Sequence, residues 1–277
     1  MLVVKTRAEL REARLALPGP VGFVPTMGAL HEGHASLVRR AREDCASVAA
    51  SIFVNPTQFG ANEDLSRYPR DEATDLALLE SLGVDLVFLP GVEDIYPPGH
   101  TMSVDVGALG EVLEGAARPG HFRGVATVVT ILFNLVAPDK GFFGQKDGQQ
   151  AVVVRRLVGD LGMPVEVVVC PTVREPDGLA MSSRNRYLTA EERRQAPILN
   201  LALHAAAGAL AAGDRSAESL RQLMRDELSA ATMGNIDYVS VADAETLQEL
   251  EMVDRPALAS IALRFPSARL IDCQPLP

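Results

Sequence analysis

Two histidines three residues apart, His31 and His34, are the side chains whose type and spacing point most directly to chemistry. Residues three apart at the start of a helix lie on one face, so both imidazoles can reach one ligand. Imidazole N–H groups can donate hydrogen bonds to phosphate oxygens. Two other interpretations stay open, namely a zinc pair and a pair of capping histidines. Zinc sites need further ligands at a recognisable spacing, and the histidines at positions 100, 121 and 204 show none.

The segment that carries these histidines, residues 21–34, reads VGFVPTMGALHEGH. Its apolar run 21–24 predicts a strand, and the apolar spacing from Ala35 to Ala41 predicts a helix after a glycine-containing turn. The first turn of a helix has N–H groups without intrahelical partners, and it carries the positive end of the helix dipole. A strand that leads into such a helix start predicts an anion site, and phosphate is the usual anion.

A second candidate for phosphate chemistry is Lys146 with Asp147, in the stretch FFGQKD. A lysine after a short strand can neutralise phosphate charge, and an aspartate can accept hydrogen bonds from ribose hydroxyls. A solvated turn with Asp147 as the N-cap of a helix explains the same two residues. From these residues alone, the solvated turn is the preferred interpretation.

The stretch MSSRN, residues 181–185, offers two hydroxyl groups and a guanidinium. Arg184 can bind phosphate in fork geometry, and Ser182 and Ser183 add hydrogen-bond donors. A polar turn before a helix is the common alternative for such a sequence.

Three amides suit a hydroxy acid, because each can both donate and accept hydrogen bonds. Gln58 and Gln150 lie near predicted strand or helix ends, and Asn55 is a neighbour of Gln58. The ordinary interpretation of such residues is a surface or capping amide. Arg70 and Arg123 are weaker candidates for anion binding, since a surface charge explains each equally well.

Five segments, in this order, resemble the signature blocks of the pantothenate synthetase family, also called the pantoate–β-alanine ligase family. They are PTMGALHEGH (25–34), FVNPTQF (53–59), GHFRGVATVV (120–129), FFGQKDGQQ (142–150) and MSSRN (181–185). The first is also similar to the HIGH-type signature of nucleotidyl-transferring Rossmann-like enzymes. The similarity runs over nearly the whole chain. Gln145 stands where the family often carries Glu, and Gly148 where it often has an aromatic residue, but neither change removes a group that the chemistry requires.

The resemblance implies an ATP-dependent condensation of (R)-pantoate with β-alanine. The products would be pantothenate, AMP and pyrophosphate, and the intermediate a pantoyl-adenylate. The resemblance also implies a homodimer, and Mg²⁺ is expected to bridge the ATP phosphates. One rival is a nucleotidyltransferase that joins AMP to a phosphorylated acceptor, and another is a non-catalytic nucleotide sensor. The second and fourth blocks favour the ligase over both.

The resemblance also implies the site residues. The expected ATP-binding residues are Met27, Gly28, Ala29, Leu30, His31, Glu32, Gly33, His34, Gly144, Gln145, Lys146, Asp147, Val173, Met181, Ser182, Ser183 and Arg184. The expected catalytic residues are His34, His31, Lys146, Ser182, Ser183 and Arg184, with His34 the first choice for contact with the phosphoryl transition state. The expected residues for pantoate and β-alanine are Gln58, Gln150 and Asn55. No metal ligand is assigned, and Asp71 and Asp75 are the acidic candidates.

Composition limits the class of protein. The chain has 277 residues, 47% of them hydrophobic, and a formal net charge of −10. This charge argues against a general nucleic-acid or anionic-membrane surface. The three cysteines show no metal spacing, which predicts a reducing cytoplasm. Charged residues appear too early at the N-terminus for a signal peptide, and the most apolar stretch, 124–137, is too short to span a membrane.

Strand and helix patterns alternate through the first 170 residues, and this order predicts an α/β fold with a Rossmann-like parallel sheet. The expected strands are 2–4, 21–24, 47–54, 84–89, 102–106, 141–143 and 165–169, and the expected helices are 7–17, 35–44, 71–82, 125–136 and 149–161. Segments 94–99, 118–124 and 145–148 are expected to be loops. Ligands bind beyond the carboxyl ends of the strands of such sheets, where residues 25–28 and 55–58 are expected to lie.

The pattern changes after about residue 185 to helices followed by strands, which predicts a smaller C-terminal α+β domain. A capping box at Thr189 and Glu192 opens an expected helix to residue 212 that contains Pro197, and Ser216 caps another to residue 232. The expected strands are 236–241, 259–265 and 268–271. The predicted domains are therefore 1–180, which binds ATP and pantoate, and 181–277, which forms a lid.

Overall fold

The computed structural model describes residues 1–61 and 63–277. By its internal contacts the chain divides into two compact units, which are residues 1–144 with 153–170, and residues 145–152 with 171–277. The sequence-based domains 1–180 and 181–277 divide the chain by function, and they stay a prediction.

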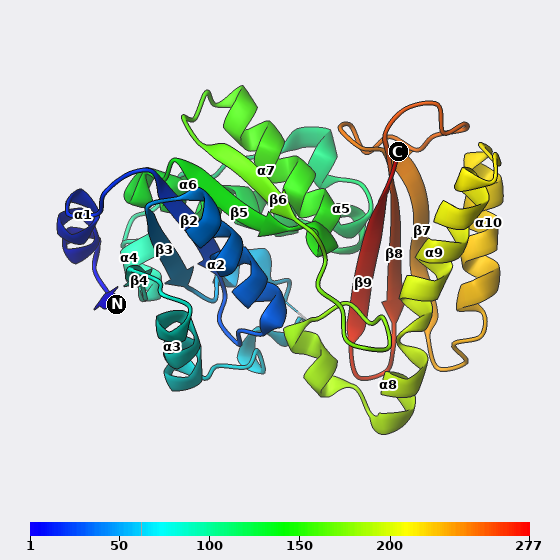
Figure 1. The fold of residues 1–277 in the computed structure, drawn as a ribbon, viewed down its shortest axis with the longest axis horizontal. Coiled ribbons are helices and arrows are strands. Elements are labelled where there is room, and N and C mark those ends of the chain that lie inside the picture. The colour runs from blue at the N-terminus through cyan, green and yellow to red at the C-terminus, as the bar shows by residue number, and fades with distance from the viewer. Residues whose placement is uncertain (62) are drawn as a thin grey trace. The chain divides into compact units, whose positions relative to one another are not determined.

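A six-stranded parallel sheet forms the centre of the first unit (Figure 1). Its strands are β1 (Leu2–Val4), β2 (Val21–Thr26), β3 (Ser47–Ile52), β4 (Leu86–Phe88), β5 (Lys140–Gly144) and β6 (Glu166–Cys170). Their order is β1-β4-β3-β2-β5-β6. From β2 the chain builds outward through β3 and β4, and β5 and β6 then extend the other side. The carboxyl ends of β2 and β5 therefore mark the switch point, where open α/β sheets bind ligands.

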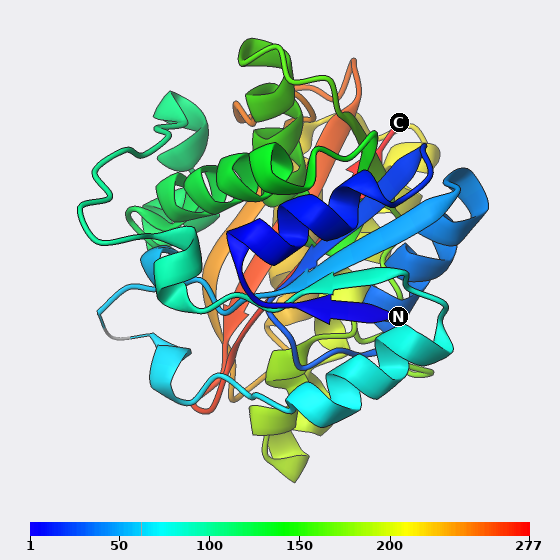
Figure 2. The ribbon, with the colours of Figure 1, turned by 90° about the vertical axis from the view of Figure 1, so that its left-hand side faces the viewer.

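Helices cover both faces of this sheet, which explains why its strands are nearly continuous apolar runs. The long helices are α1 (Arg7–Leu15), α2 (Glu32–Asp44), α3 (Glu72–Ser81), α6 (His121–Val136) and α7 (Gly148–Asp160). Leu10 of α1 and Phe133 of α6 share a hydrophobic cluster with Phe23 of β2, and Figure 2 shows α1 lying beside α6. Leu37 of α2 and Leu79 of α3 belong to a different cluster.

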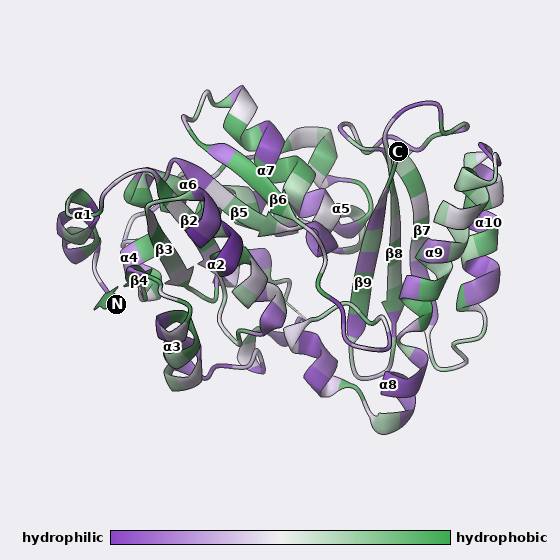
Figure 3. Ribbon diagram, viewed as in Figure 1, coloured by the Kyte–Doolittle hydropathy of each residue, from purple (hydrophilic) through white to green (hydrophobic). Residues whose placement is uncertain are grey.

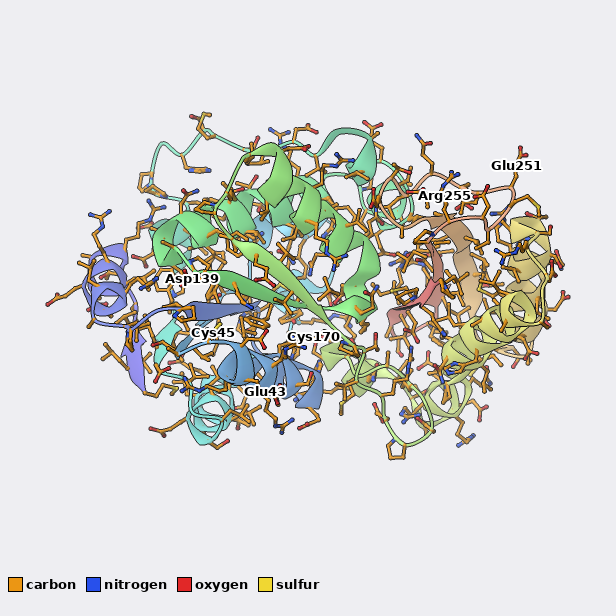
Figure 4. All side chains as sticks on the ribbon, turned by 45° about the horizontal axis from the view of Figure 1, so that its top comes forward. Glu43, Cys45, Asp139, Cys170, Glu251 and Arg255 are labelled. Atoms are coloured by element: carbon orange, nitrogen blue, oxygen red, sulfur yellow. The ribbon has the colours of Figure 1, made fainter. Side chains whose placement is uncertain are left out.

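Side chains at the amino end of the sheet tie its central strands together. Asp139, labelled in Figure 4, precedes β5, and its Oδ2 accepts a hydrogen bond from the Val21 N–H at 2.6 Å. On the neighbouring side, Asp85 accepts from the Val48 N–H at 2.8 Å. These bonds fix the starts of β2 and β3, so the ends that lead to the candidate site also have a fixed register.

A three-stranded antiparallel sheet with helices on it forms most of the second unit. Its elements are α8 (Ala190–Gln195), α9 (Ile198–Ala211), α10 (Ala217–Leu228), β7 (Asn235–Asp243), β8 (Ala257–Arg264) and β9 (Arg269–Leu276). Leu203 of α9 and Leu220 of α10 pack with Ile261 of β8 in one buried cluster. Figure 3 shows α8 largely in the hydrophilic colour, consistent with its sequence AEERRQ. The predicted α/β class with a smaller α+β part is thus confirmed.

Short elements complete the fold. They are the one-turn helices α4 (Val92–Ile95) and α5 (Glu114–Ala117) and the 3-10 turns η1 (Pro56–Gln58), η2 (Asp64–Ser66), η3 (Gly107–Gly110), η4 (Gln145–Asp147) and η5 (Ser183–Tyr187).

Four sequence-based expectations for local structure are wrong. The expected strand 102–106 is irregular, because the Val104 N–H donates to Thr127 Oγ1 at 2.9 Å instead of to a strand. The expected loop 94–99 begins inside α4. Helix α6 begins at His121 inside the expected loop 118–124, and Pro197 divides the expected C-terminal helix into α8 and α9.

The described residues also bear on the expectations for the cysteines and for membrane spans. Cys45, Cys170 and Cys273 are buried free thiols, and Figure 4 labels the first two. Over residues 1–61 and 63–277, none of the helices has both the length and the apolar character that crossing a membrane requires.

Candidate active site

The turn between β2 and α2 has an unusual backbone that a buried carboxylate holds in place. Gly28 and Ala29 adopt positive φ angles of 82° and 51°. Positive φ costs a residue with a side chain roughly 1–3 kcal/mol. Asp75 from α3 accepts from the Ala29 N–H at 2.8 Å and from the Leu30 N–H at 2.7 Å. Two hydrogen bonds to an ionised group are worth about 1.5–3 kcal/mol each, so they offset the strained backbone.

His31 and His34 cap each other at the start of α2. His31 is the N-cap residue, and its Nδ1 accepts from the Gly33 N–H at 3.1 Å. His34 occupies the third helical position, and its Nδ1 accepts from the His31 N–H at 3.3 Å. The ring centroids lie 4.2 Å apart. The helix therefore begins three residues before the predicted position 35, because a histidine pair replaces the usual Ser, Thr, Asp or Asn cap.

This reciprocal cap determines the tautomers of both histidines. A ring nitrogen that accepts from a backbone N–H carries no proton, so Nδ1 is unprotonated in both rings. In a neutral imidazole the proton is then on Nε2, which is a hydrogen-bond donor. The geometry thus makes each histidine a neutral Nε2–H donor, suited to hydrogen bonding with phosphoryl oxygens.

Asn55 fixes the orientation of the Gln58 amide. The Asn55 Oδ1 accepts from the Thr57 N–H at 3.3 Å and from the Tyr96 hydroxyl at 2.8 Å, and its Nδ2 donates to the Gly124 carbonyl at 3.2 Å. A backbone N–H can only donate and a backbone C=O can only accept, so these contacts leave one orientation of the Asn55 amide. Its Nδ2 also donates to Gln58 Oε1 at 3.0 Å.

Gln58 consequently turns its NH₂ group toward Met27, the first residue after β2. Gln58 Nε2 lies 3.2 Å from Met27 Sδ, and the Gln58 side chain is largely buried. Since thioether sulfur is a weak acceptor, this NH₂ group remains suited to an oxygen acceptor of a ligand. The structure thus brings together the 53–59 block and the turn after β2, as the sequence predicted from strand topology.

A charged network holds the main chain of Gln58. The Arg118 guanidinium forms an ion pair with Glu63, in which Nη2 lies 2.6 Å from Oε2, and it also donates to the Gln58 carbonyl at 3.2 Å. His121 Nδ1 lies 2.8 Å from the same carbonyl, and its Nε2 lies 3.1 Å from Arg118 Nη1. His121 must therefore be the neutral Nδ1–H tautomer. Burial and the nearby Arg118 charge lower the pKa of His121 to about 4.

The second unit holds the remaining candidate segments. Lys146 Nζ lies 3.4 Å from Asp147 Oδ1 in η4, directly after Gly144 ends β5. The Cys273 thiol donates to the Gln145 carbonyl at 2.9 Å. Burial raises the pKa of this thiol to about 12, so it stays protonated. Gln150 follows in the first turn of α7.

The MSSRN segment is bound to the loop that precedes it. The Met181 N–H donates to the Val173 carbonyl at 3.0 Å, and Ser182 Oγ accepts from the Arg184 N–H at 3.3 Å. Asn185 Nδ2 donates to Glu175 Oε1 at 2.9 Å. These contacts show how the chain orders the segment that contains Ser183 and Arg184.

The weaker candidates have local structural partners. Arg123 donates to Ser103 Oγ at 2.7 Å, and Arg70 Nη1 lies 3.4 Å from the Tyr68 carbonyl. Asp71 is the N-cap of α3, and its Oδ1 accepts from the Thr74 N–H at 3.2 Å.

Sequence patterns did not reveal the residues that act over long chain distances. The sequence marks Asp75 only as an acidic metal candidate, and it carries little signal for the roles of Tyr96, Arg118 and His121. Their partners lie about 40 to 60 residues away in the chain. The one sequence signal is that Arg118 and His121 flank the start of the 120–129 block.

Sequence comparison adds independent information. The family model for pantoate–β-alanine ligase matches residues 2–275. Pantothenate synthetase from Chloroflexus aurantiacus is 61% identical over 273 residues, which cover 98% of this chain and 97% of the relative. That from Roseiflexus sp. is 60% identical over 272 residues, with 98% of each chain covered.

Solved structures agree with this result. The crystal structure of pantothenate synthetase from Thermus thermophilus matches with a TM-score of 0.95 and 52% identity, over 99% of both chains. Pantoate–β-alanine ligase from Francisella tularensis, complexed with β-γ ATP and β-alanine, matches with a TM-score of 0.81 and 33% identity. That match covers 99% of this chain and 97% of the other.

Proposed function

Because the chain belongs to the pantoate–β-alanine ligase family, we propose that it activates pantoate as an acyl-adenylate and that its paired histidines stabilise the first step. As a pantoate–β-alanine ligase, it uses ATP to join an acid to an amine. The Francisella relative, whose structure is complexed with β-γ ATP and β-alanine, supports ATP and β-alanine as substrates of this chain. The observation that carries the site assignment is the reciprocal cap of His31 and His34.

In the first step, a pantoate carboxylate oxygen attacks the α-phosphorus of ATP. A bond forms between this oxygen and phosphorus, the bond to the bridging oxygen breaks, and pyrophosphate leaves. The carboxylate is already an anion, so the step needs in-line positioning and charge stabilisation rather than a general base. The Nε2–H groups of His34 and His31 are proposed to donate to phosphoryl oxygens whose charge increases in the transition state.

Further charge stabilisation is assigned to the other predicted catalytic residues. Lys146 and Arg184 would neutralise phosphate charge, and Ser182 and Ser183 would donate hydrogen bonds. Residues 27–34, 144–147, 173 and 181–184 are accordingly proposed to bind ATP. Support comes from the family membership and from the chemistry of these side chains.

Pantoate is proposed to bind at Gln58 and Gln150. The amide orientation that Asn55 imposes makes Gln58 a donor, so it suits a carboxylate or hydroxyl oxygen of pantoate. In this proposal Asn55 acts by positioning Gln58.

In the second step, the uncharged amine of β-alanine attacks the acyl carbon of pantoyl-adenylate. A C–N bond forms, the bond between the acyl carbon and the AMP oxygen breaks, and the nitrogen releases one proton. Because acyl-adenylates hydrolyse readily, the site must exclude water. A lid role for residues 181–277 stays part of the proposal.

Magnesium is proposed to arrive with ATP. Within residues 1–61 and 63–277, no group of three or more His, Cys, Asp or Glu side chains could hold a metal ion. The oxygens of Asp75 already accept two backbone N–H groups, and Asp71 caps a helix. These side chains do not fit a resident metal cage, whereas Mg²⁺ readily binds phosphates while keeping waters. Titration with Mg²⁺ should therefore show binding with ATP present and none without it.

A cytoplasmic homodimer is also proposed. The dimer is supported by the family resemblance, and the reducing compartment by three buried free thiols. Sedimentation of the purified chain would test the dimer. The nucleotidyltransferase alternative gains no support, because the family match and the named relatives favour the ligase.

The decisive experiment follows pyrophosphate release from ATP and Mg²⁺. We expect release with pantoate alone, and AMP with amide product only after β-alanine is added. Release that does not depend on pantoate would refute the substrate assignment. His34→Ala should slow the first step about 100-fold or more, as does loss of a transition-state donor elsewhere. His204→Ala, at an exposed position on α9, is the matched control and should retain activity.

A further inference from the structure

We propose that Asp75 is a positioning residue for ATP activation, which holds the β2–α2 turn so that His31 and His34 face the phosphates. The turn would then contact the ATP phosphates chiefly through its two imidazoles, because the Ala29 and Leu30 N–H groups bind this carboxylate. The inference rests on the proposed function of the histidine pair. It differs from the expectation that backbone N–H groups at this turn form the anion site.

The first observation is the geometry of the Asp75 carboxylate. Each oxygen accepts from a different N–H, since Oδ2 binds Ala29 at 2.8 Å and Oδ1 binds Leu30 at 2.7 Å. These are consecutive residues, and the next one is His31, the N-cap of α2. Asp75 therefore fixes the two peptide planes that precede Leu30, the residue just before the histidine pair.

The second observation is where the carboxylate lies. Asp75 is 3% exposed, so its charge has lost nearly all contact with bulk water. A buried carboxylate needs hydrogen-bond donors to remain ionised. The two N–H groups supply them, and the first turn of α3, where Asp75 lies, adds the positive end of a helix dipole.

The third observation is that the turn has little room for another arrangement. A Cβ atom on Gly28 would lie 2.9 Å from Asp75 Oδ2 and 3.1 Å from Ile52 Cγ2. Gly28 also has a φ of 82°, which side-chain-bearing residues rarely adopt. The carboxylate, Gly28 and the strained Ala29 thus form one tightly packed unit that specifies the turn.

These contacts engage most of the backbone donors that lead into α2. Gly33 donates to His31, His31 donates to His34, and Ala29 and Leu30 donate to Asp75. The side-chain groups at this turn whose chemistry suits phosphate oxygens are the Nε2–H groups of the two imidazoles. Their direction depends on the turn, and the turn depends on Asp75.

Asp75→Asn tests the proposal with minimal change in shape. Its amide can accept from one N–H but must direct its NH₂ group at the other, so the turn should relax. We expect the KM for ATP to rise and the rate of pyrophosphate formation to fall, each about tenfold or more, as for a lost hydrogen bond to a charged group. The KM for β-alanine and the aminolysis of preformed pantoyl-adenylate should stay within about twofold.

Glu72→Gln is the matched control. It removes one carboxylate charge from the same first turn of α3, at an exposed position. The control should leave the KM for ATP unchanged. If both variants weaken ATP binding equally, the effect comes from general charge, and the positioning role is overturned.

A spectroscopic measurement separates positioning from folding and from activity. In the wild-type protein, ¹⁵N-labelled His31 and His34 should each show an unprotonated Nδ1, and Asp75→Asn should mix the tautomers. Unchanged imidazole signals with an unchanged KM for ATP would overturn the inference. If the wild-type protein releases no pyrophosphate with pantoate, the proposed function fails, but the ¹⁵N signals still decide whether Asp75 orders the turn.

Discussion

Replacement of Gly124 by alanine should weaken pantoate binding, because α6 approaches the turn that carries Gln58 too closely for a side chain. A Cβ atom at position 124 would lie 2.5 Å from the Thr57 carbonyl oxygen and 2.7 Å from the Gln58 nitrogen. The Gly124 carbonyl also accepts from Asn55, which orients the Gln58 amide. One methyl group would thus disturb both the main chain and the amide of Gln58.

Two effects of opposite sign decide the change in stability. Alanine in place of glycine inside a helix stabilises it by about 1 kcal/mol. Overpacking costs about 1–3 kcal/mol, and the upper part of this range applies because the atoms in conflict are backbone atoms that cannot rotate away. We therefore expect Gly124→Ala to lower the free energy of unfolding by about 1–2 kcal/mol.

Steady-state kinetics and urea unfolding test this expectation together. The KM for pantoate should rise about tenfold or more, since small displacements of a positioning group cost large factors, while the KM for ATP should change less. Gly208→Ala is the matched control and should be slightly stabilised, because Gly208 lies in α9 where an added Cβ meets no described atom within 4 Å beyond the adjacent part of its own helix. If Gly124→Ala behaves like this control and keeps its KM for pantoate, the close-approach argument is wrong.

Two further predictions concern buried charges. The folded protein keeps His121 neutral down to about pH 4 while the unfolded chain protonates it near pH 6.5. The free energy of unfolding should therefore fall by about 2 kcal/mol between about pH 7 and pH 5 from this group alone. In His121→Asn, the free energy of unfolding measured with urea at each pH should depend less steeply on pH. Asp272→Asn should lower the free energy of unfolding by about 3 kcal/mol. The reason is that Asp272 is 3% exposed and binds Arg174 through two hydrogen bonds of 2.6 and 3.1 Å.

Each of these predictions has a clear contrary result. An unchanged pH slope in His121→Asn would mean that the imidazole is not held neutral between Arg118 and Gln58. For the ion pair, Arg255→Gln is a suitable comparison, since its side chain is 54% exposed and its ion pair should contribute about 1 kcal/mol or less. If Asp272→Asn and Arg255→Gln lower the free energy of unfolding equally, burial does not make the ion pair of Asp272 more important than that of Arg255.

The sequence predicted the parallel sheet well because its strands are long apolar runs separated by helical patterns. Boundaries were predicted best where capping chemistry is familiar. The predicted capping box at Thr189 and the predicted cap at Ser216 are both present in the structure, and a further capping box at Thr6 begins α1 at the expected residue. By contrast, α2 begins earlier than expected because its cap is His31, a residue type that helix statistics do not emphasise.

The start of α6 was missed for a different reason. Gly124 lowers helix propensity, so the segment before it resembled a loop. The structure shows that this glycine serves tertiary packing on η1 rather than chain flexibility. Propensity cannot reveal such a requirement, because the conflicting atoms belong to residues 57 and 58.

In the candidate site, too, some features can be predicted from the sequence and others cannot. Short-range features, such as the two histidines on one helix face, follow from spacing alone. The partners of Asp75 and Asn55 do not, because hydrogen bonds between segments about 40 or more residues apart leave no periodic signal. The sequence therefore indicated which side chains have suitable chemistry, whereas the structure shows what orients them.

The central position of β2 has a consequence for hydrogen exchange. This strand pairs with β3 along its length and with β5 on its other side, and five of its six residues are buried. Amides in such a strand exchange with solvent mainly through global unfolding. We therefore expect the turn that carries His31 to follow one of the most slowly exchanging strands of the sheet. A ligand that meets this turn should find it already ordered, so exchange protection in β2 should change little when ATP binds.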